Sequence, residues 1–317
     1  MYFPFLRGKQ FELLALKELA PPLGDAKSVH PIVEPVREPA GGLARSLGEL
    51  ESRGVPYTLV LNPSVGDLAK RPTATLELVT WAAAHVLGYR GLDFGLIVGS
   101  YFNPTETTRF LSEAGFAGTG VTLIHDDYFG DKPQLIEFAS KTRIERHLVA
   151  DKSDTRRYGD LFRGQPLVVV SDGFQSKETN VQYLDNPVTF FSDKHLYYKD
   201  DGYVGFSDFL TIGRKYAEGG SLPRAVIIHW TYLNPDDQML YVRHFASDTN
   251  EDTSDTAGKF LEAATKLVAF AAANRLENPA VSAMNVYVEG QTFPGLGTIK
   301  KLSIENHLYV LMALLAA

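Results

Sequence analysis

The stretches Phe94-Gly-Leu-Ile-Val-Gly-Ser100 and Val121-Thr-Leu-Ile-His-Asp126 contain the pattern that decides the fold of this chain. Each is a short apolar run that ends in polar residues and precedes a stretch of helical character. Such runs are typical of strands buried on both faces, and their alternation with helices is typical of a parallel sheet. The same unit recurs at Tyr2–Leu6, His30–Val36, Tyr57–Asn62, Phe94–Ser100, Val121–Asp126, His147–Asp151, Leu167–Asp172 and Gly205–Ile212. About eight such units close a (β/α)₈ barrel, so the sequence predicts an α/β fold with a TIM-like barrel.

The pattern changes after about residue 214. Ala225–Tyr232 and Met239–Phe245 flank a polar segment and read as a β-hairpin, although another strand count would place Ala225–Tyr232 inside the barrel. The acidic, Ser/Thr-rich stretch Ser247–Asp255 reads as an exposed loop, and helical patterns follow it. We therefore expect a single domain over residues 1–317. Its barrel core spans about 1–214, and a hairpin and helical extension spans about 215–317.

The composition restricts the class of protein. A net charge of −7 and a pI of about 5.6 argue against broad, sequence-independent binding of nucleic acid by the chain alone. Cysteine is absent from the sequence, which excludes disulfides, thiolate metal sites and a Cys nucleophile. The first residues lack a signal-peptide layout, and no stretch approaches the roughly 18 consecutive apolar residues of a membrane helix. These features predict a cytoplasmic protein with no membrane partner.

Barrels of this kind carry their chemistry at the carboxyl ends of the strands. We expect catalytic roles for Glu34, His125, Asp126 and Asp172. We expect a divalent cation, Mg²⁺ or Mn²⁺, to bind through the carboxylates of Glu34, Asp126, Asp151 and Asp172. Alternatively, one carboxylic acid stays neutral as a general acid beside an ionised neighbour. Asp residues after strands also cap helices and form turns, so a purely structural role for most of them stays open.

The predicted substrate-binding residues are Arg7, Lys9, Asn62, Lys152, Asp208 and His229. The cations Arg7 and Lys9 directly follow the first strand, where they would hold an anion such as phosphate, or else pair with carboxylates of the mouth. His229 and His244 would share a face of the hairpin if Ile227 lay opposite His244. Polar residues on the solvent face of a hairpin are ordinary, so this pair is also compatible with a structural role.

Motifs that specify a reaction are absent from the sequence. It contains no HExxH, EF-hand, phosphate-binding GxxxxGK[ST] or GxSxG motif. The reaction therefore has to be inferred from which side chains converge.

Two parts of the sequence carry a family resemblance. The opening Tyr2-Phe-Pro-Phe-Leu-Arg-Gly-Lys-Gln-Phe-Glu12 with His30-Pro-Ile-Val-Glu34-Pro resembles the beta-family proteins, named after a phage beta protein. The segments Gly205-Phe-Ser-Asp208 and Ala225-Val-Ile-Ile-His229-Trp, followed by Arg243-His244, resemble later segments of a bacterial branch of that family. The resemblance implies a protein of bacteria or phages, encoded in this branch beside a nuclease-like partner in mobile or defence-associated neighbourhoods. It adds weight to seven positions, Arg7, Lys9, Glu12, Glu34, Asp208, His229 and His244.

Two functions are consistent with these observations. The first is a metal-assisted hydrolase acting on a phosphate-containing or nucleotide-like substrate in a phage-defence context. The second is a non-catalytic sensor or regulatory subunit that binds a nuclease-like partner protein through the hairpin and the acidic loop.

Overall fold

The computed structural model describes residues 1–39, 41–116, 118–126, 130–150, 160–219 and 222–316. Contacts between Cα atoms divide the chain into two compact units. The first unit consists of Met1–Ser171 and Leu196–Asp208, and the second of Asp172–His195 and Phe209–Ala317.

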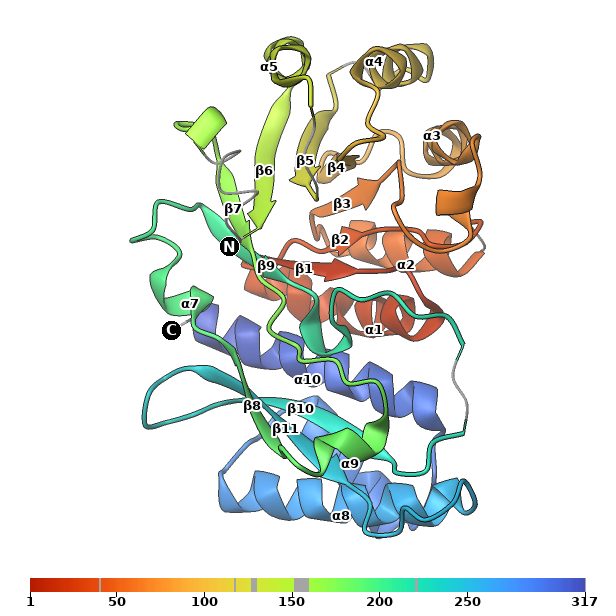
Figure 1. The fold of residues 1–317 in the computed structure, drawn as a ribbon, viewed down its shortest axis with the longest axis vertical. Helices are drawn as coiled ribbons and strands as arrows, with labels where there is room; N and C mark the ends of the chain where they lie inside the picture. Colours follow the sequence, from red (N-terminus) through yellow and green to blue (C-terminus); the bar gives the residue numbers. More distant parts are fainter. Residues whose placement is uncertain (40, 117, 127–129, 151–159, 220–221, 317) are drawn as a thin grey trace. The chain divides into compact units, whose positions relative to one another are not determined.

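The first unit is a closed barrel of parallel strands in the order β1-β2-β3-β4-β5-β6-β7-β9 (Figure 1). The strands are β1 (Tyr2–Leu6), β2 (Ile32–Val33), β3 (Tyr57–Val60), β4 (Leu92–Val98), β5 (Gly120–His125), β6 (Ile144–Ala150), β7 (Leu167–Val170) and β9 (Gly205–Asp208). Each of the predicted runs overlaps one of these strands, and β9 closes the ring by pairing with both β7 and β1. The predicted (β/α)₈ barrel is therefore confirmed.

The helices of the first unit follow the strands, as the repeating unit predicts (Figure 1). They are α1 (Gln10–Ala26), α2 (Gly41–Ser52), the short η1 (Leu68–Lys70), α3 (Ala74–His85), α4 (Pro104–Glu113) and α5 (Lys132–Lys141). Local sequence explains where they start. The side chain of Asn103 accepts the N–H of Glu106 at the start of α4, and Pro104 occupies the first turn, where a missing N–H costs nothing.

The second unit is built on a three-stranded antiparallel sheet in the order β10-β11-β8. It contains η2 (Asn180–Tyr183), β8 (Val188–Ser192), η3 (Leu210–Ile212), β10 (Ile227–Leu233), β11 (Leu240–Ala246), α8 (Thr256–Ala273), α9 (Pro279–Glu289) and α10 (Leu296–Ala316); α7 (Lys194–Tyr197) spans the boundary between units. The hairpin is present, but its register differs from the one considered above, because His229 itself lies opposite His244 while Ile227 lies opposite Ala246.

Trp230 marks the core of the second unit. It is fully buried together with Ile228, Phe260, Leu267 and Met284, which come from β10, α8 and α9. Because side chains alternate along a strand, His229 and Thr231 lie on the opposite face of the sheet.

No helix in the described part of the chain is both long enough and apolar enough to cross a membrane.

Candidate functional site

A contact across the barrel shows which side chains face its interior. The guanidinium of Arg146 on β6 lies 5.1 Å from the ring centre of Phe3 on β1, although these strands are not neighbours. Arg146 also donates to the hydroxyl of Thr122 on β5 at 2.8 Å, so Thr122 faces inward as well. Because side chains alternate along a strand, Asp126 shares the inward side with Thr122, whereas His125 faces the surrounding layer.

A cavity of about 610 Å³ lies at the carboxyl-terminal mouth of the barrel, and this volume is typical of a small-molecule site. It lies at the carboxyl ends of β3, β4 and β5, beside the first residues of α3 and α4. Its described polar side chains are Asn62, Ser64, Arg71, Thr75, Ser100, Tyr101, Glu106 and Asp126. The structure therefore brings two of the predicted residues, Asn62 and Asp126, to one cavity.

Asp126 supplies the carboxylate of this cavity that comes directly from a strand end. Its N–H donates to the carbonyl of Val98 at 3.1 Å, which continues the pairing of β4 and β5 one residue beyond β5. The residue is exposed and lines the cavity. Its backbone is thus fixed by the barrel while its carboxylate is accessible to a bound molecule.

Asn62 shapes the wall of the cavity. Its amide nitrogen donates to the carbonyl of Ile97 at 2.8 Å, and its amide oxygen accepts the N–H of the same residue at 2.8 Å. The side chain therefore continues the pairing of β3 with β4 beyond the end of β3. These two bonds position Asn62 and leave its second N–H and the second lone pair of its oxygen for a bound molecule.

Glu34 and Arg7 form a buried ion pair at the same end of the barrel. Glu34 is fully buried, and its Oε1 accepts the N–H of Ser64 at 2.6 Å and the hydroxyl of Ser64 at 3.0 Å. The N–H of Arg7 donates to Glu12 at 2.7 Å. Lys9 is the N-cap residue of α1 and is half-buried. These contacts join the ends of β1 and β2 to the loop after β3, so Glu34 and Arg7 act structurally here.

Arg71 and Glu106 add charge to the wall of the cavity. The side chain of Arg71 is 41% exposed, and its guanidinium lies 2.7 Å from the carboxylate of Glu77 and 3.5 Å from that of Glu38. Glu106 pairs loosely with Arg109, at 3.8 Å. These three ion pairs are partly or largely exposed, so they hold their partners weakly and leave the charges able to contact a ligand.

The predicted metal site stays a prediction, because Asp151, one of its four carboxylates, lies outside the described residues. The predicted anion-binding residue Lys152 lies outside them as well. Asp172 belongs to the second unit, where its Oδ1 accepts the N–H of Arg214 at 3.2 Å. The oxygens of Glu34 already bond to protein groups. In the described part of the chain, no three His, Cys, Asp or Glu side chains form a metal-binding group, and we derive no step through a metal ion.

His125 and Asp208 lie on the outward side of the barrel wall. The Nε2 of His125 lies 3.0 Å from the Nδ1 of His147, and burial lowers the pKa of His125 to about 3. Asp208 accepts the hydroxyl of Tyr2 at 2.6 Å, and burial raises the pKa of that hydroxyl well above its usual value. Tyr2 and the inward-facing Phe3 are consecutive on β1, so Tyr2 and its partner face outward. Neither predicted residue reaches the mouth cavity.

His229 lies in the second unit, where it forms a partly buried pair with His244. The two Nδ1 atoms are 2.7 Å apart, and the Nε2 of His244 lies 3.1 Å from the hydroxyl of Thr189. Burial, followed by the neighbouring ring, lowers the pKa of His229 to about 3. Both rings are therefore neutral at pH 7 and act as hydrogen-bonding groups.

A polar layer inside the barrel was not predicted. Asp93 pairs with Arg146 and lies 3.4 Å from the Nε2 of His30, which in turn lies 2.9 Å from the hydroxyl of Thr58. These residues come from the beginning of their strands, at the end of the barrel opposite to the mouth. At that end polar side chains contribute to stability, so we assign the layer to folding.

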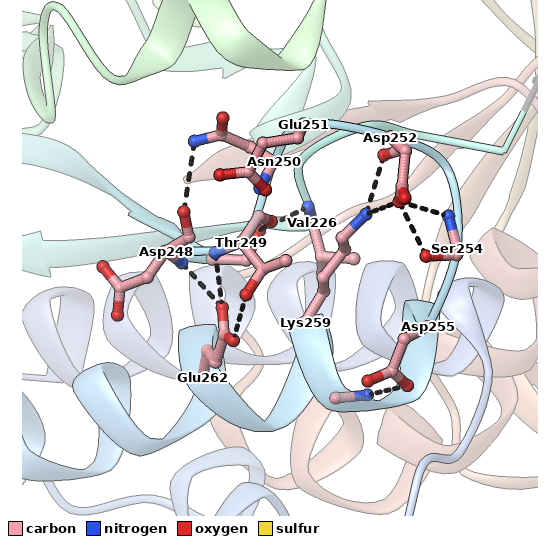
Figure 2. A network of polar contacts seen from close by, with 12 residues as sticks. Val226, Asp248, Thr249, Asn250, Glu251, Asp252, Ser254, Asp255, Lys259 and Glu262 are labelled. Carbon is pink, nitrogen blue, oxygen red and sulfur yellow. Dashed lines mark hydrogen bonds and ion pairs between the residues drawn. The ribbon is translucent and has the colours of Figure 1, made fainter.

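The acidic loop at residues 247–255 is held onto α8 (Figure 2). Glu262 accepts the N–H and the hydroxyl of Thr249, at 2.9 and 2.6 Å, and these bonds lower the pKa of Glu262. Lys259 is 1% exposed and donates to the carbonyl of Asp252 at 2.7 Å. The Asp252 side chain remains 67% exposed. The loop thus has a defined shape and an acidic outer surface.

Comparisons with known proteins add a likeness of fold. No family model matches the chain, and no curated protein sequence matches it. Among solved structures, N-acetylneuraminate lyase from Mycoplasma synoviae is similar at 13% identity and a TM-score of 0.39, covering 66% of this chain and 67% of that one. A truncated 3-deoxy-D-arabino-heptulosonate 7-phosphate synthase from Thermotoga maritima is similar at 12% identity and a TM-score of 0.37, covering 65% and 74%. SuiB from Streptococcus suis, bound to S-adenosylmethionine, is similar at 10% identity and a TM-score of 0.30, covering 65% of this chain and 47% of that one. The barrel assignment rests on the strand order of this chain, and no function is transferred from these proteins.

Proposed function

We propose that this chain is a barrel enzyme that converts a small polar substrate in the mouth cavity, with Asp126 as its general acid or base. The observation that carries the proposal is the position of Asp126. Its carboxylate follows β5, lies on the inward side and is exposed to a cavity of about 610 Å³. A carboxylate held in this way can take a proton from a substrate or give one to it.

The other residues of the cavity have supporting roles in this proposal. The hydroxyls of Ser64 and Ser100 offer hydrogen bonds to a polar substrate. Arg71 offers a guanidinium, which suits a phosphate or carboxylate group. Asn62 and the buried pair described above fix the cavity wall, so the site is formed before the substrate binds.

The narrower proposal is hydrolysis of a phosphate-containing or nucleotide-like substrate. Arg71 supports it, because it is the cation among the described side chains that line the cavity. Glu106 and Asp126 oppose it, because they place two carboxylates near any phosphate group. A role in phage defence and a nuclease-like partner come from the family resemblance alone and remain part of the proposal.

The test compares substrate consumption by three proteins. Wild type, Asp126→Asn and the control Glu113→Gln are incubated with a small-metabolite extract and with a nucleotide panel, and consumption is followed by mass spectrometry. Glu113 is an exposed carboxylate on α4 that does not line the cavity. We expect wild type and Glu113→Gln to consume the same compound and Asp126→Asn to lose at least about 100-fold in rate.

Two outcomes would contradict the proposal. Equal turnover by wild type and Asp126→Asn would remove Asp126 from the reaction. Absence of turnover by wild type, together with co-purification of a protein partner, would favour the sensor or regulatory subunit instead.

A further inference from the structure

The second unit contains its own cavity, of about 360 Å³, between β10, η3 and the start of α10. This volume accommodates a small organic molecule. Apolar side chains form much of the wall, among them Phe174, Ile212, Ile227, Leu296 and Ile299. Lys300 also lines the cavity, but it already interacts with another group of the protein. A molecule in this cavity therefore meets a largely apolar surface, and the available polar groups decide its chemistry.

His229 presents one ring nitrogen to this cavity. Its Nδ1 lies 2.7 Å from the Nδ1 of His244, so that nitrogen is used within the protein. Its Nε2 forms no hydrogen bond with any of the described residues, and the ring is partly buried and lines the cavity. The Nε2 atom is therefore available to a bound molecule.

The orientation of the His229 ring is fixed by its neighbours. The rings of Phe174 and Tyr183 pack edge-on against it, at 4.9 and 4.7 Å between centroids. His244, which faces its Nδ1, is itself held by the hydroxyl of Thr189, 3.1 Å from its Nε2. The available nitrogen is thus positioned before a ligand arrives, which limits the entropy lost on binding.

The same chain of hydrogen bonds lets this nitrogen act in two ways. If His244 donates its Nδ1–H, the Nε2 of His229 carries the hydrogen and donates. If His229 donates instead, its Nε2 becomes an acceptor and His244 donates to Thr189. Both forms are uncharged, so the nitrogen can meet either partner of a neutral hydrogen bond.

Asn180 offers a second polar group to the cavity. Its Nδ2 donates to the carbonyl of Ala225 at 2.9 Å, and since a carbonyl can only accept, this bond determines how the amide is oriented. Its Oδ1 accepts no hydrogen bond within the described part of the chain, and the half-buried side chain lines the same cavity. The Oδ1 atom is therefore a positioned acceptor for an N–H or O–H group.

We propose that this cavity binds a small uncharged molecule in which an apolar ring carries an amide-like group, such as an aromatic amide. The Oδ1 of Asn180 accepts the N–H of the ligand, and the Nε2 of His229 donates to its carbonyl. Phe174 and Ile299 contact the ring.

The cavity selects against charged ligands for a physical reason. An ion that enters an apolar-walled cavity loses hydration, and a neutral amide and a neutral imidazole replace that hydration only in part. A neutral amide loses less hydration, and the same two groups can satisfy it. The site lies in the second unit and is independent of the reaction proposed at the barrel mouth.

The experiment measures binding of benzamide to the full chain at pH 7 by isothermal titration calorimetry. Benzoate and benzamidine have the same shape and serve as the anionic and cationic counterparts. Asn180→Leu removes the acceptor, and its matched control is Asn274→Leu, because Asn274 also donates to a backbone carbonyl, at 2.8 Å, but does not line the cavity. Ile212→Trp fills the cavity and leaves the side chains of Asn180 and His229 unchanged. Asp126→Asn separates this site from the barrel mouth.

We expect saturable binding of benzamide, with benzoate and benzamidine binding at least about tenfold more weakly. Asn180→Leu should weaken benzamide binding about tenfold, and Ile212→Trp should abolish it. Asn274→Leu and Asp126→Asn should leave it unchanged. In spectra of ¹⁵N-labelled histidine, benzamide should place the hydrogen of His229 on Nε2. Circular dichroism of each variant verifies that it is folded.

Three results would overturn the proposal. The first is the absence of benzamide binding at tens of millimolar. The second is binding that Asn180→Leu and Ile212→Trp both leave intact, because benzamide would then lie elsewhere. The third is tighter binding of benzoate or benzamidine than of benzamide, because the cavity would then select for charge.

Discussion

Replacement of Glu34 by Gln tests whether this residue holds the barrel mouth together. The Glu34 side chain is fully buried and that of Arg7 is 9% exposed, so the substitution removes one charge of a buried pair. The amide oxygen of the introduced Gln can still accept both hydrogen bonds from Ser64. The NH₂ group of the same side chain then faces the guanidinium of Arg7, and two hydrogen-bond donors oppose each other.

The expected loss of stability follows from this geometry. Breaking a buried ion pair by removal of one partner costs about 3–5 kcal/mol. Because the bonds from Ser64 can persist, we expect the lower end, about 3 kcal/mol. If the free energy of unfolding falls by about 2 kcal/mol per molar urea, the urea concentration at the midpoint of barrel unfolding should fall by about 1.5 M.

The assay is hydrogen exchange of peptides from β1 to β4, measured across a urea series so that it reports on the barrel. The control is Glu49→Gln on α2, which removes an exposed partner of Arg53 at 3.4 Å. Exposed pairs contribute little, so the control should change stability by less than about 0.5 kcal/mol. If Glu34→Gln behaved like this control, the buried pair would not stabilise the mouth and our reasoning about Glu34 would be refuted.

Two further predictions concern other buried polar groups. Arg146→Met should destabilise the barrel by about 3 kcal/mol, because it removes the cation that offsets the burial of Asp93, a burial that already raises the pKa of this carboxyl. The double variant with Asp93→Asn should recover part of the loss in the same urea assay. The second unit should lose stability as the pH falls from about 6.5 toward 4. Burial lowers the pKa values of His229 and His244 in the folded protein to about 3 and about 4, so in this pH range only the unfolded chain binds protons at these residues. Each His contributes up to about 1.4 kcal/mol per pH unit. Urea midpoints are measured from the fluorescence of Trp230 in a Trp81→Phe background, because Trp81 lies in the first unit. They should depend less steeply on pH in His244→Asn, and an unchanged slope would contradict the pairing.

The barrel could be predicted from the sequence because its strands are buried on both faces. A run such as Phe94–Ser100 is apolar throughout and stands out against the helices around it. The same property hides which residues face inward, since both sides of the strand are apolar. His125 and Asp126 are adjacent and equally polar in the sequence, yet only Asp126 faces the mouth cavity.

Hydrogen-bond partners that lie in loops could not be predicted from the sequence. The role of Glu34 depends on Ser64, which no periodicity connects to it. Strand β8 was missed because it does not belong to the repeating strand–helix pattern and pairs with β11, about fifty residues later in the chain. The inner layer did leave a signal, because Asp93 and Arg146 are charged residues within strands that are otherwise largely apolar.

The central claim is that the reaction takes place in the cavity beside Asp126. The most direct measurement is a crystal structure of the Asp126→Asn variant with the compound that the wild-type protein consumes. The account predicts that the compound occupies the mouth cavity, with a reacting atom within hydrogen-bonding distance of residue 126. A compound bound in another part of the molecule, with the mouth cavity empty, would contradict it.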